Sequence, residues 1–202
     1  MYICVLDFEA TCWKDKSGPG FEHEIIEFPS VLINYDENTG KITKLGEFQE
    51  FCNPKLNKTL SDFCTELTGI TQDQVDKADS FLNVFKRHFQ WLVETVPDFH
   101  NQKVYILTYG NWDLANVIKL EFKRWNIKSV PAIYKQFINI KTEAAKFYHC
   151  RKMGMDGLLK YLGMELIGRH HSGISDTRNI TNIFQRMVED GYNSELIKIN
   201  IA

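Results

Sequence analysis

Three short stretches of the chain, DFE, GNWD and HHSGISD, carry the side chains best suited to bind cations or to move protons. Asp7 and Glu9 stand in the first stretch, at the end of an apolar run. Successive side chains of a strand alternate between its faces, so these two carboxylates point to the same side. Because like charges repel each other there, we expect a compensating divalent cation, and oxygen ligands suit Mg²⁺ or Mn²⁺.

The second and third stretches supply three further groups. Asp113 follows an apolar run and a Gly-Asn turn and enters the first turn of a predicted helix. His171 lies on a loop five residues before Asp176, which falls in the first turn of the last predicted helix. Together with Asp7 and Glu9, these residues stand at strand ends or near helix starts. They indicate a two-metal phosphoryl-transfer site, in which two ions about 3.5–4 Å apart clamp the attacking and leaving oxygens.

Each stretch alone also has an ordinary structural interpretation. Asp7 and Glu9 can be solvated carboxylates at a strand end, and an aspartate such as Asp113 is favoured in a first helical turn by the helix macrodipole. His170 and His171, adjacent on a loop, can simply be solvated. The combination of the three stretches carries the metal-site hypothesis. No competing motif is present, since the sequence has no P-loop, no GxSxG and no zinc-ligand spacing.

The elements that must position these groups follow from hydrophobic periodicity and turn signals. Strands are predicted at residues 2–8, 25–35, 42–51, 103–110 and 137–140, with turns at 14–20 and 37–40. Helices are predicted from Ser61 to Gly69, from Ser80 to before Pro97, and at residues 111–124, 142–148, 156–162 and 174–189. This order predicts an α/β domain with a mixed sheet and helices on its faces. Sites in such folds form at the carboxyl ends of strands, where Asp7 and Glu9 stand.

Length and composition narrow the class of protein. The 202 residues fit one domain spanning residues 1–202, and a formal net charge of −2 argues against binding long nucleic acids by charge alone. Five cysteines without a CxxC pair indicate reduced thiols. No secretory signal and no apolar run of about 20 residues is visible. We therefore expect a soluble intracellular protein, in the cytoplasm and/or nucleus, without a membrane partner.

Longer stretches resemble a known family. VLDFEATCW, HEIIEFPSVLI, SDFCTELTGITQ and LGMELIGRHHSGISDTRNI are similar to the DEDD superfamily of 3′-to-5′ exonucleases, in the HxxxxD (DEDDh, DnaQ-like) branch. More narrowly, they resemble the family of the histone-mRNA 3′ exonuclease and the RNAi-regulating exoribonucleases. The resemblance runs from Ile3 to about Met187. It implies a ribonuclease-H-like α/β fold with a five-stranded mixed β-sheet flanked by helices.

The resemblance also implies roles for the residues that match the family's motifs. Asp7 would bridge two Mg²⁺ ions, for which Mn²⁺ can substitute, and Asp113 would support their coordination. His171 would be the general base, because a neutral imidazole can take a proton from the attacking water, whereas His170 matches no catalytic position. The implied catalytic set is Asp7, Glu9, Asp113, His171 and Asp176, and its four carboxylates are the implied metal ligands.

A second implied set would cradle the terminal nucleotide: Phe8, Ala10, Thr11, Leu67, Thr68 and Trp112. An apolar or aromatic wedge against a base contributes roughly 1–3 kcal/mol without reading sequence. Leu67 and Trp112 can instead be ordinary packing residues. Basic side chains later in the chain can guide a phosphate backbone; they are Lys119, Lys123, Arg124 and Lys128 after the second motif, and Lys146, Arg151, Lys152 and Arg169 further on. The first four can instead lie on a solvated helix face.

The sequence thus predicts a metal-dependent 3′-to-5′ exoribonuclease that removes nucleoside 5′-monophosphates from the 3′ ends of single-stranded RNA. One alternative is the same chemistry on DNA, including proofreading, because discrimination through the 2′-hydroxyl cannot be read from these residues. Another is a catalytically silent nucleic-acid-binding module. The presence of all four acids and the histidine disfavours that second alternative.

Overall fold

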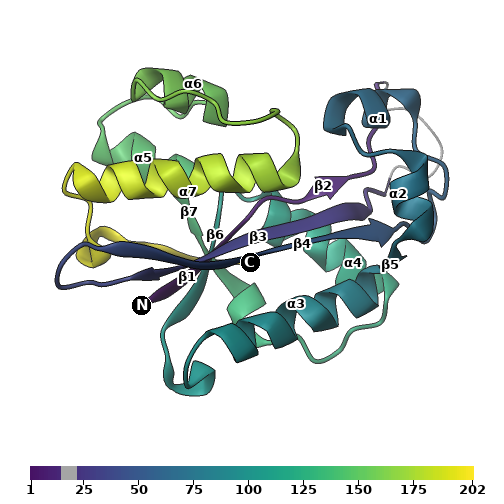
Figure 1. The fold of residues 1–202 in the computed structure, drawn as a ribbon, viewed down its shortest axis with the longest axis horizontal. Helices are drawn as coiled ribbons and strands as arrows, with labels where there is room; N and C mark the ends of the chain where they lie inside the picture. Colours follow the sequence, from purple (N-terminus) through teal and green to yellow (C-terminus); the bar gives the residue numbers. More distant parts are fainter. Residues whose placement is uncertain (15–21) are drawn as a thin grey trace.

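A computed structural model describes residues 1–14 and 22–202 and shows a central mixed sheet between two layers of helices (Figure 1). The strands follow the order β5-β4-β3-β1-β6-β7-β8, and β2 pairs with β3. The predicted turn at residues 14–20 lies, apart from Lys14, outside the described residues. The strands are β1 (Tyr2–Leu6), β2 (Glu9–Ala10), β3 (Ile25–Tyr35), β4 (Ile42–Asn53), β5 (Asp79–Ser80), β6 (Val104–Thr108), β7 (Gln136–Asn139) and β8 (Ile199–Ile201).

The α/β class is confirmed, but the predicted number of strands is corrected. Within the part of the chain that the structure describes, the sheet has eight strands rather than five. The five predicted strands correspond to β1, β3, β4, β6 and β7, whereas β2, β5 and β8 are only two or three residues long. Strands this short contain too few residues to show an alternating pattern, so the sequence carries no periodic signal for them.

The helices cover both faces of the sheet. In Figure 1, α5, α6 and α7 lie on one face, and α3 and α4 lie on the other. The α-helices are α1 (Asp62–Thr68), α2 (Gln72–Lys77), α3 (Phe81–Thr95), α4 (Ile118–Arg124), α5 (Ile140–Phe147), α6 (Met155–Tyr161) and α7 (Gly173–Glu189). Shorter helical turns are η1 (Phe99–Asn101), η2 (Trp112–Val117), η3 (Ala132–Lys135) and η4 (Ser194–Leu196).

Strand β1 is buried on both faces, as its continuous apolar run predicts. Cys4 and Leu6 belong to the core beneath α3, and Ile3 and Val5 belong to the core beneath α7. β1 pairs antiparallel with β3 and parallel with β6, and β6 pairs parallel with β7. The carboxyl ends of β1 and β6 therefore meet at one edge of the sheet, and the residues that follow them come together there.

Local capping explains where the helices near this edge begin and end. Ser61 caps α1 by accepting the N–H of Cys64, and Gly69 ends the helix with a φ of 77°. The sequence did not predict α2, which is preceded by Thr71 as N-cap in a capping box but has too few apolar residues for a helical stripe. The predicted helix at residues 111–124 is present, but its first part, η2, is wound as a π-helix, a form frequent at functional sites.

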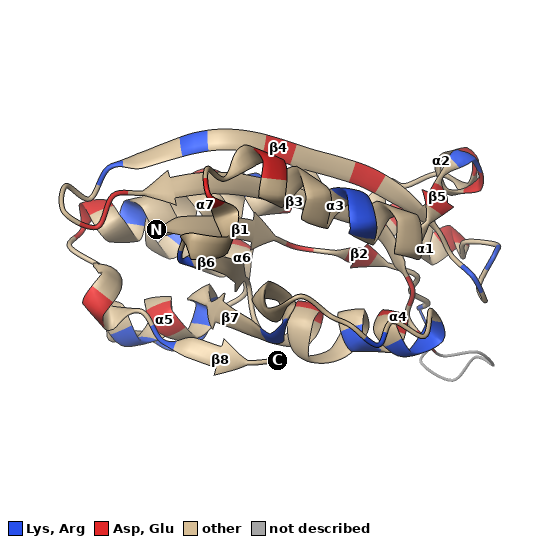
Figure 2. Ribbon diagram, turned by 90° about the horizontal axis from the view of Figure 1, so that it is seen from below, with Lys and Arg blue, Asp and Glu red and all other residues tan. Residues whose placement is uncertain are grey.

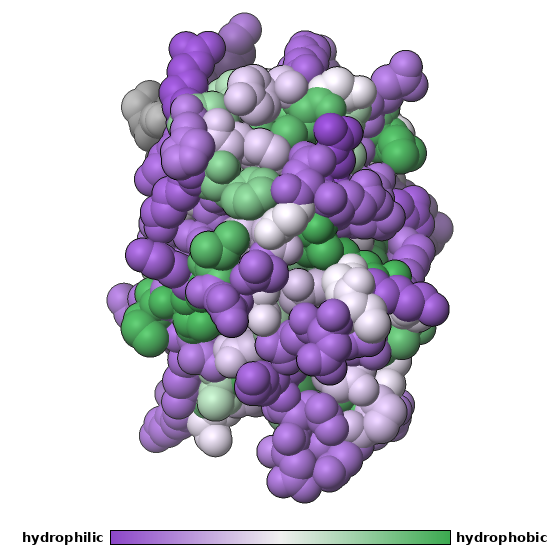
Figure 3. Space-filling model, turned by 90° about the vertical axis from the view of Figure 1, so that its left-hand side faces the viewer, coloured by the Kyte–Doolittle hydropathy of each residue, from purple (hydrophilic) through white to green (hydrophobic). Residues whose placement is uncertain are grey.

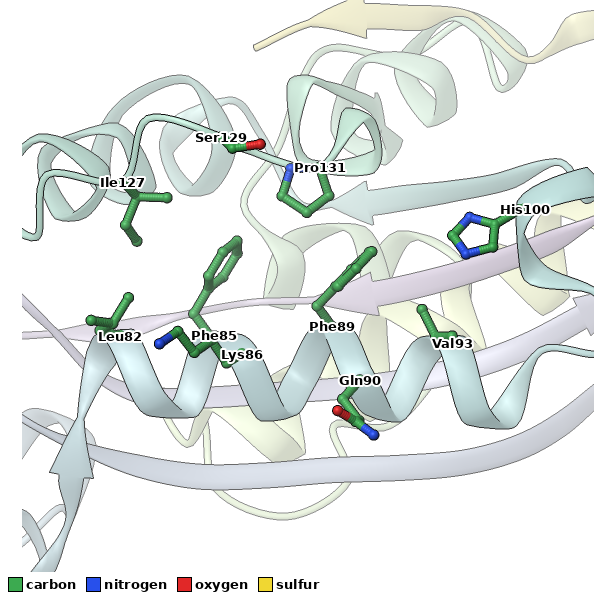
Figure 4. A pocket seen from close by; sticks show the side chains of 10 residues that line it. All are labelled: Leu82, Phe85, Lys86, Phe89, Gln90, Val93, His100, Ile127, Ser129 and Pro131. Atoms are coloured by element: carbon green, nitrogen blue, oxygen red, sulfur yellow. The ribbon is translucent and has the colours of Figure 1, made fainter.

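The sheet face covered by α3 also carries an apolar groove. It has a volume of about 590 Å³, and Phe85, Phe89 and Pro131 project into it (Figure 4). None of the described residues lining it is a carboxylate, so it is separate from the acidic residues singled out above. The end of the molecule shown in Figure 3 is mostly hydrophilic, with apolar side chains in small separate groups.

Two further expectations concern redox state and membranes. All five cysteines are free thiols, as predicted. Within residues 1–14 and 22–202, no helix has both the length and the apolar character needed to cross a bilayer.

Candidate active site

Three of the predicted carboxylates converge at the carboxyl end of β1. Asp7 directly follows β1, Glu9 lies on β2, and Asp176 lies in the first turn of α7. One carboxylate oxygen from each lies within 4.8 Å of the others. A separation of this order is what a shared divalent cation can bridge with small side-chain rotations. The fold therefore brings together residues 169 positions apart in sequence into one acidic group.

Asp113 approaches the same group from η2, at the end of β6. It is 3% exposed, and its Oδ1 accepts the backbone N–H of Phe8 at 2.9 Å. This hydrogen bond fixes the backbone between Asp7 and Glu9. Asp113 is not part of the group within 4.8 Å, so the structure does not bring this predicted ligand together with the other three carboxylates.

Burial without a counter-charge raises the pKa of each of these carboxyls. Burial raises the pKa of Glu9 to about 9, with further contributions from Asp176 and other neighbouring acids. Burial and then the charge of Asp113 raise the pKa of Asp7 well above its usual value. Burial raises the pKa of both Asp113 and Asp176 to about 6. Ionising all four groups is therefore costly unless a cation is present.

One carboxylate oxygen of the group lacks a hydrogen-bond partner in the described part of the chain, and a cation could take that place. Asp176 is 3% exposed, and its buried Oδ1 has no hydrogen-bond partner among the described residues. Buried carboxylate oxygens are normally hydrogen-bonded or bound to a metal. The donor set, made only of carboxylates, suits a hard divalent cation. Asp7, Glu9 and Asp176 can therefore hold such a cation, with Asp113 supporting them.

Glu27 on β3 positions α7 and was missed by the sequence interpretation. It is buried, and it accepts the N–H of Gly173 at 3.1 Å, the N–H of Ile174 at 3.3 Å and the side-chain amide of Gln49 at 2.8 Å. A carboxylate at a helix N-terminus satisfies free N–H groups and interacts favourably with the helix dipole. The available signal was a single acid inside the apolar strand IIEFPSVLI.

Gly173 lets the start of α7 approach the end of β1. A Cβ atom at this position would lie 2.8 Å from Cγ of Pro29 and 3.0 Å from both the carbonyl oxygen of Asp7 and Oε2 of Glu27. Two of these neighbours are held in place, one as a backbone atom and one as a buried, hydrogen-bonded carboxylate. Glycine is therefore required here for close packing rather than for its backbone angles, and Asp176 reaches Asp7 because of it.

We expect Gly173→Ala to weaken both the fold and the site. Overpacking at this contact should lower the free energy of unfolding by about 1–3 kcal/mol. A 1 Å displacement of Asp176 should lower the catalytic rate by roughly a hundredfold. Urea denaturation and a rate assay measure the two effects. Gly154→Ala is the matched control, because a Cβ there meets open space. Equal effects of both substitutions would contradict the packing argument.

His171 is held next to the acidic group by its own backbone. Its φ is 63°, and its N–H donates to Oδ2 of Asp176 at 2.8 Å. Burial, His170 and Arg169 lower the pKa of His171, which favours the neutral imidazole near pH 7. The ring of His170 stacks on that of His171, with centroids 4.1 Å apart and an angle of 15° between the planes.

The structure divides the predicted nucleotide-binding residues by exposure. Phe8 is buried and packs edge-on against Phe28, with ring centroids 4.6 Å apart, and Ala10 is also buried. The Thr11 hydroxyl accepts the N–H of Glu24, so it is occupied within the fold. A nucleotide would therefore meet this segment mainly through its backbone.

The remaining three residues of that set lie on α1 and η2. Thr68 is buried, and its hydroxyl donates to the carbonyl oxygen of Cys64 at 2.8 Å. Leu67 is half-buried. Trp112 is 38% exposed and meets the ring of His23 edge-on, with centroids 5.7 Å apart. Leu67 and Trp112 are thus the members whose side chains reach solvent.

Two of the basic residues that could guide a phosphate backbone form contacts within the fold instead. The Arg124 side chain is 4% exposed, and its nitrogens lie 2.7 Å from Glu121, 3.1 Å from Glu22 and 3.6 Å from Glu24. It is therefore not available to a phosphate backbone, a constraint that only the folded chain reveals. Arg169 donates to the carbonyl oxygens of Glu66 and Leu67 at the end of α1.

Acidic and basic residues alternate along several of the described elements. Figure 2 shows acidic and basic segments close together on α3, α4 and α5, and further acidic segments along β4. This distribution agrees with the net charge of −2. Contacts with a nucleic acid are therefore expected to be short and local.

Comparison with known proteins gives a family and several relatives. A family model described as Exonuclease matches residues 4–184. The mouse protein 3′-5′ exoribonuclease 1 is 41% identical over 192 residues, covering 94% of this chain and 54% of the relative. The zebrafish (Danio rerio) protein ERI1 exoribonuclease 2 is 38% identical, covering 94% of this chain and 35% of the relative. The chain thus spans about half the length, or less, of these curated relatives.

Solved structures are similar over nearly the whole chain. The nuclease domain of 3′hExo, a DEDDh family member bound to rAMP, has a TM-score of 0.87 and 39% identity, covering 98% of this chain and 96% of that one. A structure described as 3′-end specific recognition of histone mRNA stem-loop by 3′-exonuclease has a TM-score of 0.88 and 37% identity, covering 98% and 66%. These likenesses confirm the ribonuclease-H-like fold.

Proposed function

The chain belongs to the exonuclease family, and on that premise we propose that it is a divalent-metal-dependent 3′-to-5′ exoribonuclease. It would hydrolyse phosphodiester bonds from the 3′ ends of single-stranded RNA and release nucleoside 5′-monophosphates. The supporting observation is the approach of Asp7, Glu9 and Asp176 to within 4.8 Å, with the His171 N–H bonded to Asp176. Family membership confirms the resemblance drawn from the motifs. RNA is favoured because relatives are named exoribonucleases and one similar domain holds rAMP.

The metal would be Mg²⁺, with Mn²⁺ as a substitute, held by Asp7, Glu9 and Asp176 and supported by Asp113. When bound, two such ions lower the pKa of the attacking water and neutralise charge on the phosphate. The buried, partnerless Oδ1 of Asp176 supports this assignment. Asp113 also holds the backbone between Asp7 and Glu9 in place, because its carboxylate accepts the N–H of Phe8.

His171 would act as the general base in this scheme. A ring nitrogen of the neutral imidazole accepts a proton from the attacking water. The hydrogen bond from its backbone N–H to Asp176 keeps the histidine beside the acidic group, and its lowered pKa would keep the ring neutral near pH 7. We propose that residues 1–202 form one catalytic domain. The free thiols support the proposed intracellular location of the protein.

The terminal nucleotide would rest between two walls of the site. Backbone groups of Phe8, Ala10 and Thr11 would form one wall. Leu67, with Thr68 behind it, would contact the base from α1, and Trp112 would contact it from η2. Support for this placement comes from exposure, since Leu67 and Trp112 are the members of the set with side chains accessible to solvent.

We expect Trp112→Ala to raise KM more than it lowers kcat. Loss of a ring against a base costs roughly 1–3 kcal/mol, which corresponds to a KM increase of about 5- to 150-fold. Steady-state kinetics on a short RNA measure this effect. Trp112→Phe should recover most of the affinity, because it keeps a ring. A fall in thermal stability without a change in KM would show that Trp112 is only a packing residue.

A gel time course tests the proposed function. Single-stranded RNA and DNA of the same sequence, labelled at the 5′ end, are incubated with Mg²⁺, with and without a 3′-phosphate block. A ladder that shortens from the 3′ end supports the exonuclease, and the ratio of rates assigns the substrate. No shortening of either substrate in Mg²⁺ or Mn²⁺ would favour a silent binding module.

A further inference from the structure

A second group of potential ligands lies beside the acidic one and differs from it in chemistry. One ring nitrogen each of His170 and His171 and one carboxylate oxygen of Asp176 lie within 4.8 Å of one another. Two imidazoles and a carboxylate, with a water in the fourth position, are a usual ligand set for Zn²⁺. We propose that His170, His171 and Asp176 form an inhibitory zinc site at the edge of the catalytic centre.

The ligand atoms of this group are available. No hydrogen bond between described residues uses the ring of His170 or of His171, and the Oδ1 of Asp176 is buried without a partner. The two rings are nearly parallel and 4.1 Å apart, so a nitrogen of each can turn to the same side. Bonds of about 2.0–2.2 Å to zinc require ligand atoms roughly 3.3–3.6 Å apart. Rotation of two rings on a solvent-accessible loop can close that difference.

The two groups of potential ligands favour different ions. Asp7, Glu9 and Asp176 offer only oxygen ligands, which suit Mg²⁺. Nitrogen ligands favour Zn²⁺ strongly over Mg²⁺ and Mn²⁺, in line with the Irving–Williams order. His170 supplies the second nitrogen, so it determines whether zinc is preferred. It is not a member of the group that would hold magnesium.

Zinc bound here would stop catalysis. Asp176 belongs to both groups, and His171 is the proposed base, so an ion on the histidine pair removes one magnesium ligand and one proton acceptor together. This consequence rests on the proposed function, whereas zinc binding itself does not. Mg²⁺ and Zn²⁺ should therefore compete, and inhibition should weaken as the concentration of Mg²⁺ rises.

Calorimetric titration of ZnCl₂ into the protein, without Mg²⁺ or RNA, tests the site directly. We expect His170→Ala to weaken zinc affinity at least tenfold. His100→Ala is the matched control, because His100 is exposed and lines the apolar groove on the other face of the sheet (Figure 4). Equal zinc affinity of His170→Ala and the unaltered protein would overturn the proposal, and this result is independent of nuclease activity.

Inhibition is tested in a second arm, with each variant compared with its own zinc-free rate in Mg²⁺. The zinc concentration that halves the rate should rise at least tenfold in His170→Ala and stay unchanged in His100→Ala. If His170→Ala loses zinc binding in calorimetry but is inhibited as before, the inhibitory role is wrong. If no variant has nuclease activity, the proposed function fails, while the calorimetry still decides whether the zinc site exists.

Discussion

Asp7→Asn should abolish exonuclease turnover, with a loss of more than about a thousandfold. The amide keeps the shape of the side chain but removes one negative charge from a group whose oxygens lie within 4.8 Å of one another. Metal-assisted charge stabilisation contributes several kcal/mol to reactions of this kind, and each 1.36 kcal/mol is a factor of ten. Single-turnover rates on a 3′-labelled RNA measure the loss. Asp36→Asn, on the exposed turn between β3 and β4, is the control.

The same acidic group should make the metal-free protein less stable as the pH rises. Burial and like charges raise the pKa of Asp7 and raise that of Glu9 from 4.5 to about 9. An acid whose pKa is higher in the folded state keeps its proton there after the unfolded chain has released its own. The free energy of unfolding should therefore fall as the pH rises from about 4.5 towards 9 in the presence of a chelator.

Urea denaturation at pH 5 and pH 8, with a chelator or with Mg²⁺, checks this sign. We expect the chelated protein to be less stable at pH 8, Mg²⁺ to restore the difference, and Asp7→Asn to gain less from Mg²⁺ than the unaltered chain. A chelated protein that is more stable at pH 8 than at pH 5 would contradict the account of the acidic group as a cation site.

The convergence of the carboxylates could be predicted because it follows from strand geometry. Asp7 follows β1 and Asp113 follows β6, and the parallel pairing of these strands brings their carboxyl ends to one edge. The long strands and the helices with an apolar stripe could also be predicted, because both show hydrophobic periodicity in a single sequence.

The remaining features depend on contacts between distant residues. Glu27 meets the N-terminus of α7 across 146 positions, and Gly173 matters only because Pro29 and Asp7 lie against it. Arg124 could be taken for a surface cation from the sequence, but in the fold its side chain is buried among three glutamates. None of these contacts produces a periodic pattern in the amino-acid sequence, so each can be recognised only in the folded structure.

His171→Ala should lower kcat by about 10²- to 10⁴-fold, the usual contribution of a general base. KM and the affinity for Mg²⁺ should change by no more than a few-fold, because the hydrogen bond to Asp176 comes from the backbone N–H and survives the substitution. Rapid-quench kinetics and metal titration separate the two effects. This division between rate and binding distinguishes a base from a residue that only orders the loop.

The pH profile gives a second, independent readout of that role. A general base must be neutral, and burial, His170 and Arg169 lower the pKa of His171 below its usual 6.5. The rate of the unaltered chain should therefore rise with pH through a midpoint below 6.5, and His171→Ala should lose that acidic limb. His170→Ala, which removes the stacked neighbour, should keep it and keep most of the rate. If instead His170→Ala loses the limb while His171→Ala retains it, the proton acceptor is the other histidine.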